Sequence, residues 1–242
     1  MKFFSMDSPL MQGLGKLADL MFLNILTLIC CIPIFTVGAA WTALYYMTLK
    51  IVRDEEVYIA RDYFKSFRQN LKQATAVWLL QIFVTAILVL DYYLMYNDEV
   101  KSGFPLVLQV MLMVVTVIAI TTFMFVYPVM SKFENDLKHT LKNAFLMGVM
   151  QLPKVILMVI LWIAPLVISV VAFQIFPLVV LFGMSLPAFT SSLMYNKFFQ
   201  RMEDRMRERA REAGELPEDP GQEDEHIFSD TLDPTLEEKR PN

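Results

Sequence analysis

The sequence predicts an all-α fold, a polytopic bundle of transmembrane helices, and three observations lead to this prediction. The 242 residues are 56% hydrophobic and 19% charged, whereas soluble domains average about 45–50% apolar and about 25% charged residues. Four long stretches contain no Asp, Glu, Lys or Arg. The basic residues gather in every second connection between the helices that these stretches predict, as is typical of membrane proteins. An ordinary soluble enzyme is therefore disfavoured.

The four charge-free stretches have the length and the pattern of membrane helices. They lie at 20–49, 73–90, 102–131 and 155–196. A hydrocarbon core of about 30 Å needs roughly 20 apolar residues per helix. Unsatisfied backbone groups in lipid cost several kcal/mol, so each stretch must be helical. None of them shows the period-two alternation of a transmembrane strand.

The first stretch is too long for one crossing and contains a turn signal. With its flanks, 17–49 would form a helix of about 50 Å, but Pro33 and Gly38 bracket a plausible turn. We expect a hairpin of two short helices at about 17–32 and 38–52. The alternative is one span followed by an interfacial helix.

The remaining stretches predict four more spans. Two of them form one helix each, and the last is long enough for two helices divided near Pro177. Residues 1–198 thus form one membrane-embedded helical domain. The predicted spans are 17–32, 38–52, 74–95, 104–130, 154–174 and 177–197.

The distribution of charge predicts the orientation. Basic residues crowd the connections 53–73 and 131–153, the N-terminal flank and the segment after the last span, while Lys101 alone lies on the opposite side. By the positive-inside rule these connections and both termini are cytoplasmic, with six spans. If the first hairpin is a single span, five spans result and the N-terminus moves outside.

The segments outside the spans also carry structural signals. Arginines alternate with acids at 199–213, which predicts a charged juxtamembrane helix. At 214–242 acids far outnumber bases and prolines recur, so an acidic disordered tail is expected. Aromatic residues among mixed charges in 53–73 indicate a helix lying in the interface, and 137–152 has helical spacing. Aromatic residues near the span ends are interpreted as belt anchors, namely Trp41, Tyr45, Tyr46, Trp78, Tyr92, Tyr93, Tyr127 and Trp162.

Two intramembrane polar residues, Asn24 and Asp91, are the candidate functional residues, because polar groups in lipid are costly and often functional. Asn24 falls near the middle of the first helix, where a hydrogen bond between helices is favoured over contact with a substrate. Asp91 lies near the outer end of its span beside Tyr92 and Tyr93, where an interfacial acid is inexpensive. The spans contain no mid-bilayer acid of the kind that ion-coupled carriers commonly need.

Patterns that carry catalysis or cofactor binding do not occur in the sequence. The two histidines, His139 and His226, lack metal-ligand spacing. No phosphate-binding glycine loop and no Gly-x-Ser-x-Gly elbow is present. We therefore expect no enzymatic activity, no cofactor, no metal and no nucleic-acid partner. The expected partners are the lipid bilayer and other membrane proteins, which the cytoplasmic loops would contact.

A set of short motifs runs along the chain. They are LADLMFLN at 17–24, PIFTVGA at 33–39, ALYY at 43–46, DYFKSFRQNLKQ at 62–73 and LKNA at 141–144. As a set they resemble the YesL-like family of bacterial integral membrane proteins, over about residues 3–200 and without the acidic tail. The resemblance implies a multi-pass protein of the cell membrane, mostly of Gram-positive bacteria, often encoded beside carbohydrate uptake and degradation systems.

The activity of that family is not established, so the resemblance assigns no site residues. It implies an accessory or regulatory role near a carbohydrate import complex, by analogy rather than by mechanism. A small-solute permease or channel is the alternative, since helices interrupted near Pro33, Pro165 or Pro187 could offer backbone carbonyls to a substrate.

Overall fold

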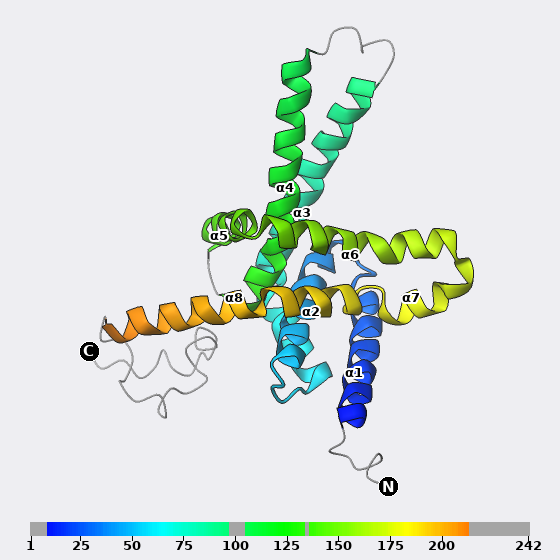
Figure 1. The fold of residues 1–242 in the computed structure, drawn as a ribbon, viewed down its shortest axis with the longest axis vertical. Helices are drawn as coiled ribbons and strands as arrows, with labels where there is room; N and C mark the ends of the chain where they lie inside the picture. Colours follow the sequence, from blue (N-terminus) through cyan, green and yellow to red (C-terminus); the bar gives the residue numbers. More distant parts are fainter. Residues whose placement is uncertain (1–8, 97–104, 134–135, 213–242) are drawn as a thin grey trace.

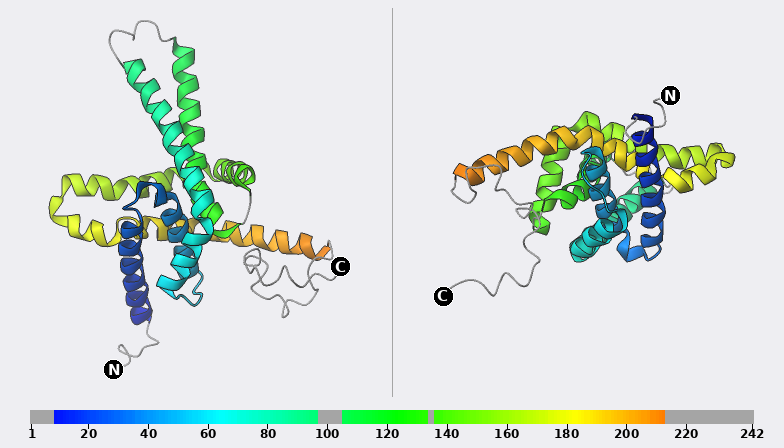
Figure 2. Two further views of the ribbon diagram at one scale, coloured as in Figure 1. Left: turned by 180° about the vertical axis from the view of Figure 1, so that it is seen from behind. Right: turned by 90° about the horizontal axis from the view of Figure 1, so that it is seen from below.

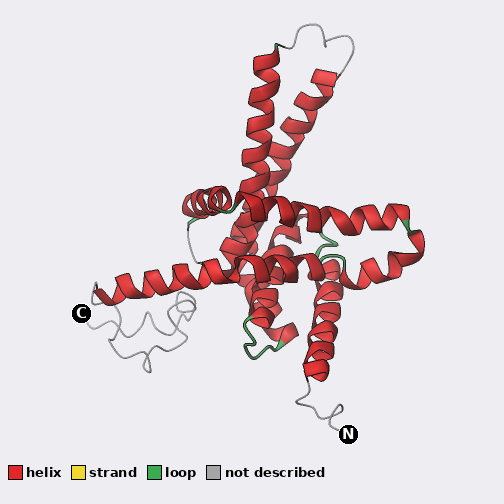
Figure 3. Cartoon of the chain, viewed as in Figure 1, coloured by secondary structure: helices red, strands yellow, loops and turns green. Residues whose placement is uncertain are grey.

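The structure, a computed structural model, describes residues 9–96, 105–133 and 136–212. These residues form eight α-helices and two short 3₁₀ helices, and they contain no strand (Figures 1 and 3). The all-α expectation is therefore confirmed for the described chain. The elements are α1 (Pro9–Cys30), η1 (Ile34–Thr36), α2 (Val37–Val52), α3 (Ile59–Tyr96), α4 (Leu106–Lys132), α5 (Leu137–Met150), α6 (Leu152–Val171), η3 (Phe173–Ile175), α7 (Phe176–Phe182) and α8 (Ser185–Glu212).

Several of these helices can cross a membrane. Among the described residues, α1, α3, α4 and α6 are each long and apolar enough, and the bent pair α7–α8 adds a fifth span if it counts as one. Helix α2 has 16 residues, which is shorter than the roughly 20 that a crossing needs. The chain is thus a helical protein with four or five candidate spans, while six spans and cytoplasmic termini stay predictions.

The helical hairpin expected near the N-terminus is present as α1 and α2. The hydroxyl of Thr36 holds the turn between them by donating to the carbonyl oxygens of Cys30 at 2.6 Å and of Pro33 at 2.7 Å. Helix α1 begins at Pro9, earlier than the expected start near residue 17. A proline at the first helical position is favourable because its missing N–H would have no partner there.

Helix α3 differs from the expectation, because it is one continuous helix of 38 residues. At about 1.5 Å per residue it is about 57 Å long. The connection 53–73 therefore does not contain a separate interfacial helix, since from Ile59 onward it is the first part of α3. Neither Gly nor Pro occurs between Ile59 and Tyr96, so no local signal ends the helix at the membrane boundary.

The last predicted span, 177–197, is broken in the structure. Helices α7 and α8 meet at a bend of 48°, with Gly183 and Met184 between them. Pro187 lies in the first turn of α8, where its missing N–H removes no helical hydrogen bond. Helix α8 then continues without interruption to Glu212, so the charged juxtamembrane helix expected at 199–213 is the second half of α8.

The core of the molecule surrounds α2. This helix contacts α1, α3, α4 and α8 and lies between them in each view (Figure 2). We call this region the hub and define it as 20–30 of α1, α2 with Arg53, 59–78 of α3, 121–132 of α4, 140–148 of α5 and 185–203 of α8. Most residues of α2 are buried, and many of them are Gly, Ala or Thr. A Cβ atom added at Gly38 would collide with the carbonyl oxygen of Ala74, so α2 and α3 approach closely here.

Two helical arms leave the hub. The first consists of 79–96 of α3 with 106–120 of α4 and extends upward in Figure 1, and the second is 163–182, which extends to the right. None of the described side chains in either arm is buried. Val170, for example, is 85% exposed. Such surface is unfavourable in water but is the normal lipid-facing surface of a membrane helix.

Candidate functional site

Asn24 of α1 lies at the break between α7 and α8 and is fully buried. Its Oδ1 accepts hydrogen bonds from the backbone N–H groups of Met184, at 2.9 Å, and Ser185, at 2.8 Å. Its Nδ2 donates to the carbonyl oxygen of Val180 at 2.7 Å. The side chain therefore caps the start of α8 and satisfies a carbonyl at the end of α7. The hydrogen bond between helices that the sequence favours for Asn24 is present.

The geometry around Asn24 explains how a broken helix is tolerated in a membrane protein. A break frees backbone N–H and C=O groups, and these are costly in lipid unless other groups satisfy them. Both acceptor positions of the amide oxygen and one of the two amide N–H groups are used by the backbone. Ser185, also fully buried, has a hydroxyl without a hydrogen-bond partner among the described residues. Asn24 thus positions the break and leaves little free capacity for a ligand.

All three tryptophans of the chain meet where the arms join the hub. Trp41 of α2 packs against Trp162 of α6, Tyr127 of α4 and Trp78 of α3, with ring centroids 4.9, 5.4 and 6.1 Å apart. The indole of Trp162 donates to the Tyr45 hydroxyl at 3.0 Å. The interpretation of these five residues as belt anchors is therefore wrong, because they pack against one another across four helices.

A chain of hydroxyl groups crosses the hub beside this cluster. Thr48 of α2 lies 2.9 Å from Ser192 of α8, oxygen to oxygen, and Ser192 lies 2.9 Å from the hydroxyl of Tyr195. All three side chains are buried. The link joins α2 to α8 through hydrogen bonds, which hold membrane helices together where apolar side chains gain nothing over lipid.

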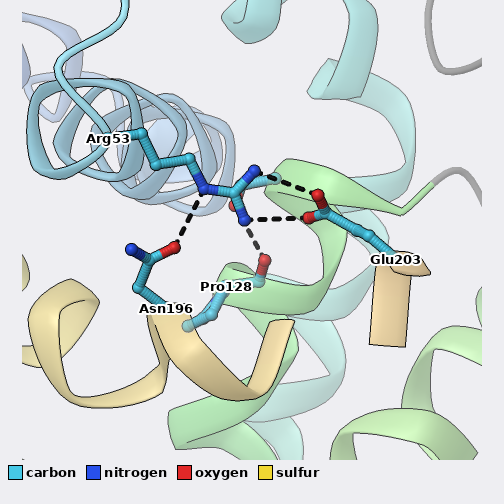
Figure 4. Close-up of polar contacts among 5 residues, drawn as sticks. Arg53, Pro128, Asn196 and Glu203 are labelled. Carbon is cyan, nitrogen blue, oxygen red and sulfur yellow. Dashed lines mark hydrogen bonds and ion pairs between the residues drawn. The ribbon is translucent and has the colours of Figure 1, made fainter. Parts of the chain in front are cut away.

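A buried ion pair closes the hub at its charged end. Arg53, just after α2, binds Glu203 of α8 through two parallel hydrogen bonds of 3.0 and 2.9 Å and donates its Nε–H to Asn196 at 2.9 Å (Figure 4). The carbonyl group of Pro128 in α4 also points toward the guanidinium in Figure 4. The two charged side chains are 10% and 8% exposed. A bidentate pair of this kind fixes the orientation of the two elements as well as their distance.

The local backbone explains why Arg53 faces α8. Helix α2 ends in a Schellman motif, in which the N–H of Glu55 donates to the carbonyl of Lys50 and the N–H of Asp54 to that of Ile51. Asp54 has a φ of 55°, a left-handed conformation that Asp tolerates better than most residues. Helix α2 ends at Val52, and the chain reverses at Asp54. Arg53 lies between them, with its side chain directed toward Glu203 of α8.

Asp91 has a different environment from Asn24. It lies in the first arm, near the end of α3, and is half-buried. The described residues form no hydrogen bond or ion pair with it, and its neighbour Tyr92 pairs instead with Thr116 at 3.2 Å. The structure therefore does not bring the two candidate residues together. A functional role for Asp91 stays a prediction.

Sequence reasoning missed Arg53, Asn196 and Glu203. Each occurs in a segment rich in charged or polar residues, and no spacing distinguishes the buried Glu203 from its exposed neighbours Asp204 and Glu208. Among the described residues, no group of three or more His, Cys, Asp or Glu side chains could hold a metal ion. The site is thus a set of contacts between helices.

Comparison with known proteins supports the family resemblance in a coarser form. A family described as "Protein of unknown function, DUF624" matches residues 20–92. This is the family to which YesL belongs, and the match names no activity. The matched segment includes Asn24, all of α2, Arg53 and most of α3. No curated protein and no solved structure matches the chain.

Proposed function

We propose that this protein is a non-enzymatic accessory or regulatory component of the cell membrane that acts by contact with a partner. The observation that carries the proposal is the use of the polar groups in the hub. Asn24, the Thr48–Ser192–Tyr195 chain and the Arg53–Glu203 pair all hold helices together. The buried polar atoms without a partner among the described residues belong to neutral groups of Trp41, Trp78, Gln151, Ser185 and Ser191. None of them is an ionisable group of the kind that general acid–base catalysis commonly uses.

The contact surface that we propose is the charged half of α8 with the neighbouring cytoplasmic connections. Lys197, Gln200, Arg201, Asp204 and Arg205 are exposed on α8. The helix extends from the hub well past the other elements on its side in Figure 1. The Arg53–Glu203 pair holds α8 within this charged segment, so the exposed residues on either side of Glu203 have a fixed position relative to α2. A rigid, charged helix is a suitable surface for a protein partner in the cytoplasm.

The partner that we propose is a carbohydrate import complex, as the family resemblance implies. A photo-crosslinking residue at Gln200, used in native membranes with mass spectrometry, should capture subunits of such a complex. The matched control carries the crosslinker at Val170, which is exposed on an arm, and should capture lipid. Two results together would contradict the proposal: a crosslinker at Gln200 that captures no import subunit, and sugar uptake that is unchanged when the protein is deleted.

A small-solute permease or channel is the second candidate. The break between α7 and α8 favours it, since transporters often bind substrates at broken helices, and the Ser185 hydroxyl there has no partner among the described residues. Purified full-length protein in liposomes should then raise their permeability to sugars or ions. The Asn24→Ala variant should change that permeability, because Asn24 holds the break. Liposomes that gain no permeability would dispose of this candidate.

A further inference from the structure

Helix α3 carries a row of exposed basic residues on one face. Arg61, Lys65, Arg68 and Lys72 follow one another at spacings of three and four residues, so they share one side of the helix. We call these four residues the basic stripe. All four are exposed, and among the described residues none of them takes part in an ion pair.

The surroundings of the basic stripe leave its positive charge uncompensated. The acid in this part of α3, Asp62, points away and pairs with Lys50 of α2 at 3.1 Å. A shallow, wide-open groove lies on the same face, lined only by residues of α3, namely Ala60, Arg61, Phe64, Lys65, Arg68 and Gln69. Its walls combine cationic groups with an exposed aromatic ring and methylene stems. This combination suits a ligand that has an anionic group attached to apolar chains.

The same face of α3 continues into the lipid-facing surface of the first arm. Beyond Lys72 the exposed positions become apolar, with Leu79, Phe83 and Leu90 among the most exposed side chains. At about 1.5 Å per residue, 74–96 is about 34 Å long, which matches a hydrocarbon core of about 30 Å. The aromatic rings of Tyr93 and Tyr96 are exposed at the far end, as expected at an interface.

This length places the nearer half of the basic stripe, Arg68 and Lys72, at the level of the lipid headgroups. Lys72 lies about 3 Å and Arg68 about 9 Å before Ala74 along the helix axis, within or near the headgroup layer. Lys65 and Arg61 lie about 14 and 20 Å before it. Lys65 is within about one Debye length, about 8 Å, of the headgroup layer and is attracted to it, whereas Arg61 is farther out and its attraction is largely screened.

We propose that the basic stripe of α3 binds the headgroups of anionic phospholipids in the leaflet next to the basic connections. The cationic face, the groove and the continuous apolar face above them fit the two parts of one lipid molecule. The acidic segment 214–242 of this chain carries the same sign of charge as such lipids. A phospholipid also supplies acyl chains for the exposed apolar side chains beyond Lys72, so lipid is the occupant that fits both parts of this surface.

The test compares two triple variants of the full-length protein in a nonionic detergent. R61Q/K65Q/R68Q removes two arginines and one lysine from the stripe, and K197Q/R201Q/R205Q removes the same residue types from the exposed face of α8. Native mass spectrometry then measures the affinity for dioleoylphosphatidylglycerol and for dioleoylphosphatidylcholine. Thermal unfolding of each variant at the same temperature as the unchanged protein shows that both variants are folded.

We expect the stripe variant to lose affinity for phosphatidylglycerol by about twenty-five-fold, since Lys65 and Arg68 near an anionic surface contribute about fivefold each and Arg61 is largely screened. Its affinity for phosphatidylcholine should stay within threefold of the unchanged protein, and the α8 variant should keep both affinities. A stripe variant that keeps its phosphatidylglycerol affinity, or an α8 variant that loses as much, overturns the proposal. Removal of 214–242 should leave the affinity for phosphatidylglycerol unchanged. If removal raises this affinity tenfold, and the gain is lost in the stripe variant, the acidic segment is the occupant of the stripe instead.

Discussion

The hub and the arms are both built from apolar helices, yet only the hub is packed. Helix α4 contains both kinds of region in one element. Its first part, 106–120, has no buried side chain, whereas its last part contains eight buried residues, from Thr121 to Ser131. Hydrophobicity cannot cause this difference, because a lipid tail is as apolar as a leucine side chain.

What distinguishes the hub is its content of small and polar residues. Gly38 and Gly148 allow close approach of neighbouring helices, and a Cβ at Gly148 would meet the side chain of Thr121 at 2.5 Å. Hydrogen bonds between helices also concentrate there, whereas the Tyr92–Thr116 contact lies in an arm. Membrane helices associate through packing and hydrogen bonds, so these residues decide which segments meet.

The largest effect should come from opening the Arg53–Glu203 ion pair. Arg53→Met removes the bidentate partner of the buried Glu203 carboxylate and leaves Lys132 as a nearby cation, so the free energy of unfolding should fall by about 3 kcal/mol, the lower end for a broken buried pair. Titration of the purified protein with SDS, followed by circular dichroism, measures this change. A cost below about 1 kcal/mol would mean that the pair does not stabilise the hub.

The double variant R53M/E203L distinguishes the interaction energy of the ion pair from the costs of the two single substitutions. Replacement of both charges by apolar side chains removes the desolvation cost along with the attraction, so most of the lost stability should return. A double variant whose cost equals the sum of the two single costs would contradict this account, because independent sites add and coupled sites do not.

Close helix packing in the hub predicts the next effect. Gly38→Ala forces a Cβ against the carbonyl oxygen of Ala74 and to within 2.9 Å of the Trp78 Cβ, and we expect it to cost about 1–3 kcal/mol. Gly15→Ala in α1 is the matched control, since no atom lies within 4 Å of the added Cβ. This control should be neutral or stabilising by up to about 1 kcal/mol, because Ala is the better helix former. Equal changes in the free energy of unfolding for Gly38→Ala and Gly15→Ala, measured by the same SDS titration, would contradict the close contact between α2 and α3.

The helical type and the approximate positions of the elements could be predicted from the sequence, whereas their number, their lengths and their partners could not. Charge-free stretches indicate helices because the lipid permits little else, and Pro33 with Gly38 indicates the turn of the first hairpin. The spacing of apolar and aromatic residues in 53–73 could not show that α3 continues past the membrane boundary. A helix that extends a membrane span into water and a helix that lies in the interface have the same spacing. The interfacial reading of 53–73 failed for this reason.

The candidate site was predictable only where a polar residue interrupts an apolar stretch. Asn24 has that signal, and its hydrogen bonds between helices follow from it. Glu203 has no such signal, because it lies among other charged residues, and its burial against Arg53 is visible only in the three-dimensional structure. Trp41, Trp78 and Trp162 occur at positions typical of belt anchors, and only the three-dimensional arrangement shows that they pack together.

Replacement of polar residues extends the comparison of hub and arm. Asn24→Ala removes three hydrogen bonds at the break between α7 and α8 and should cost about 1–2 kcal/mol, the range for a lost cap and for polar contacts in membranes. Gln174→Ala, at an exposed position of the second arm, should change stability by less than about 0.5 kcal/mol. Both are read from the SDS titration midpoint, and a larger effect at Gln174 would show that the arm is packed against something in the folded protein.

The smallest expected effect uses one substitution at two valines. Val77 in the hub is fully buried, while Val170 in the second arm is 85% exposed. When the unfolded helices stay in the detergent or lipid phase, both side chains keep an apolar environment, so the transfer part of the hydrophobic effect cancels. Val77→Ala should then cost only the lost packing, about 1 kcal/mol, and Val170→Ala should cost nothing measurable. A cost at Val170 equal to that at Val77 would mean that the second arm is packed in the folded protein. It would also remove the distinction between hub and arm on which the comparison of Asn24 with Gln174 rests.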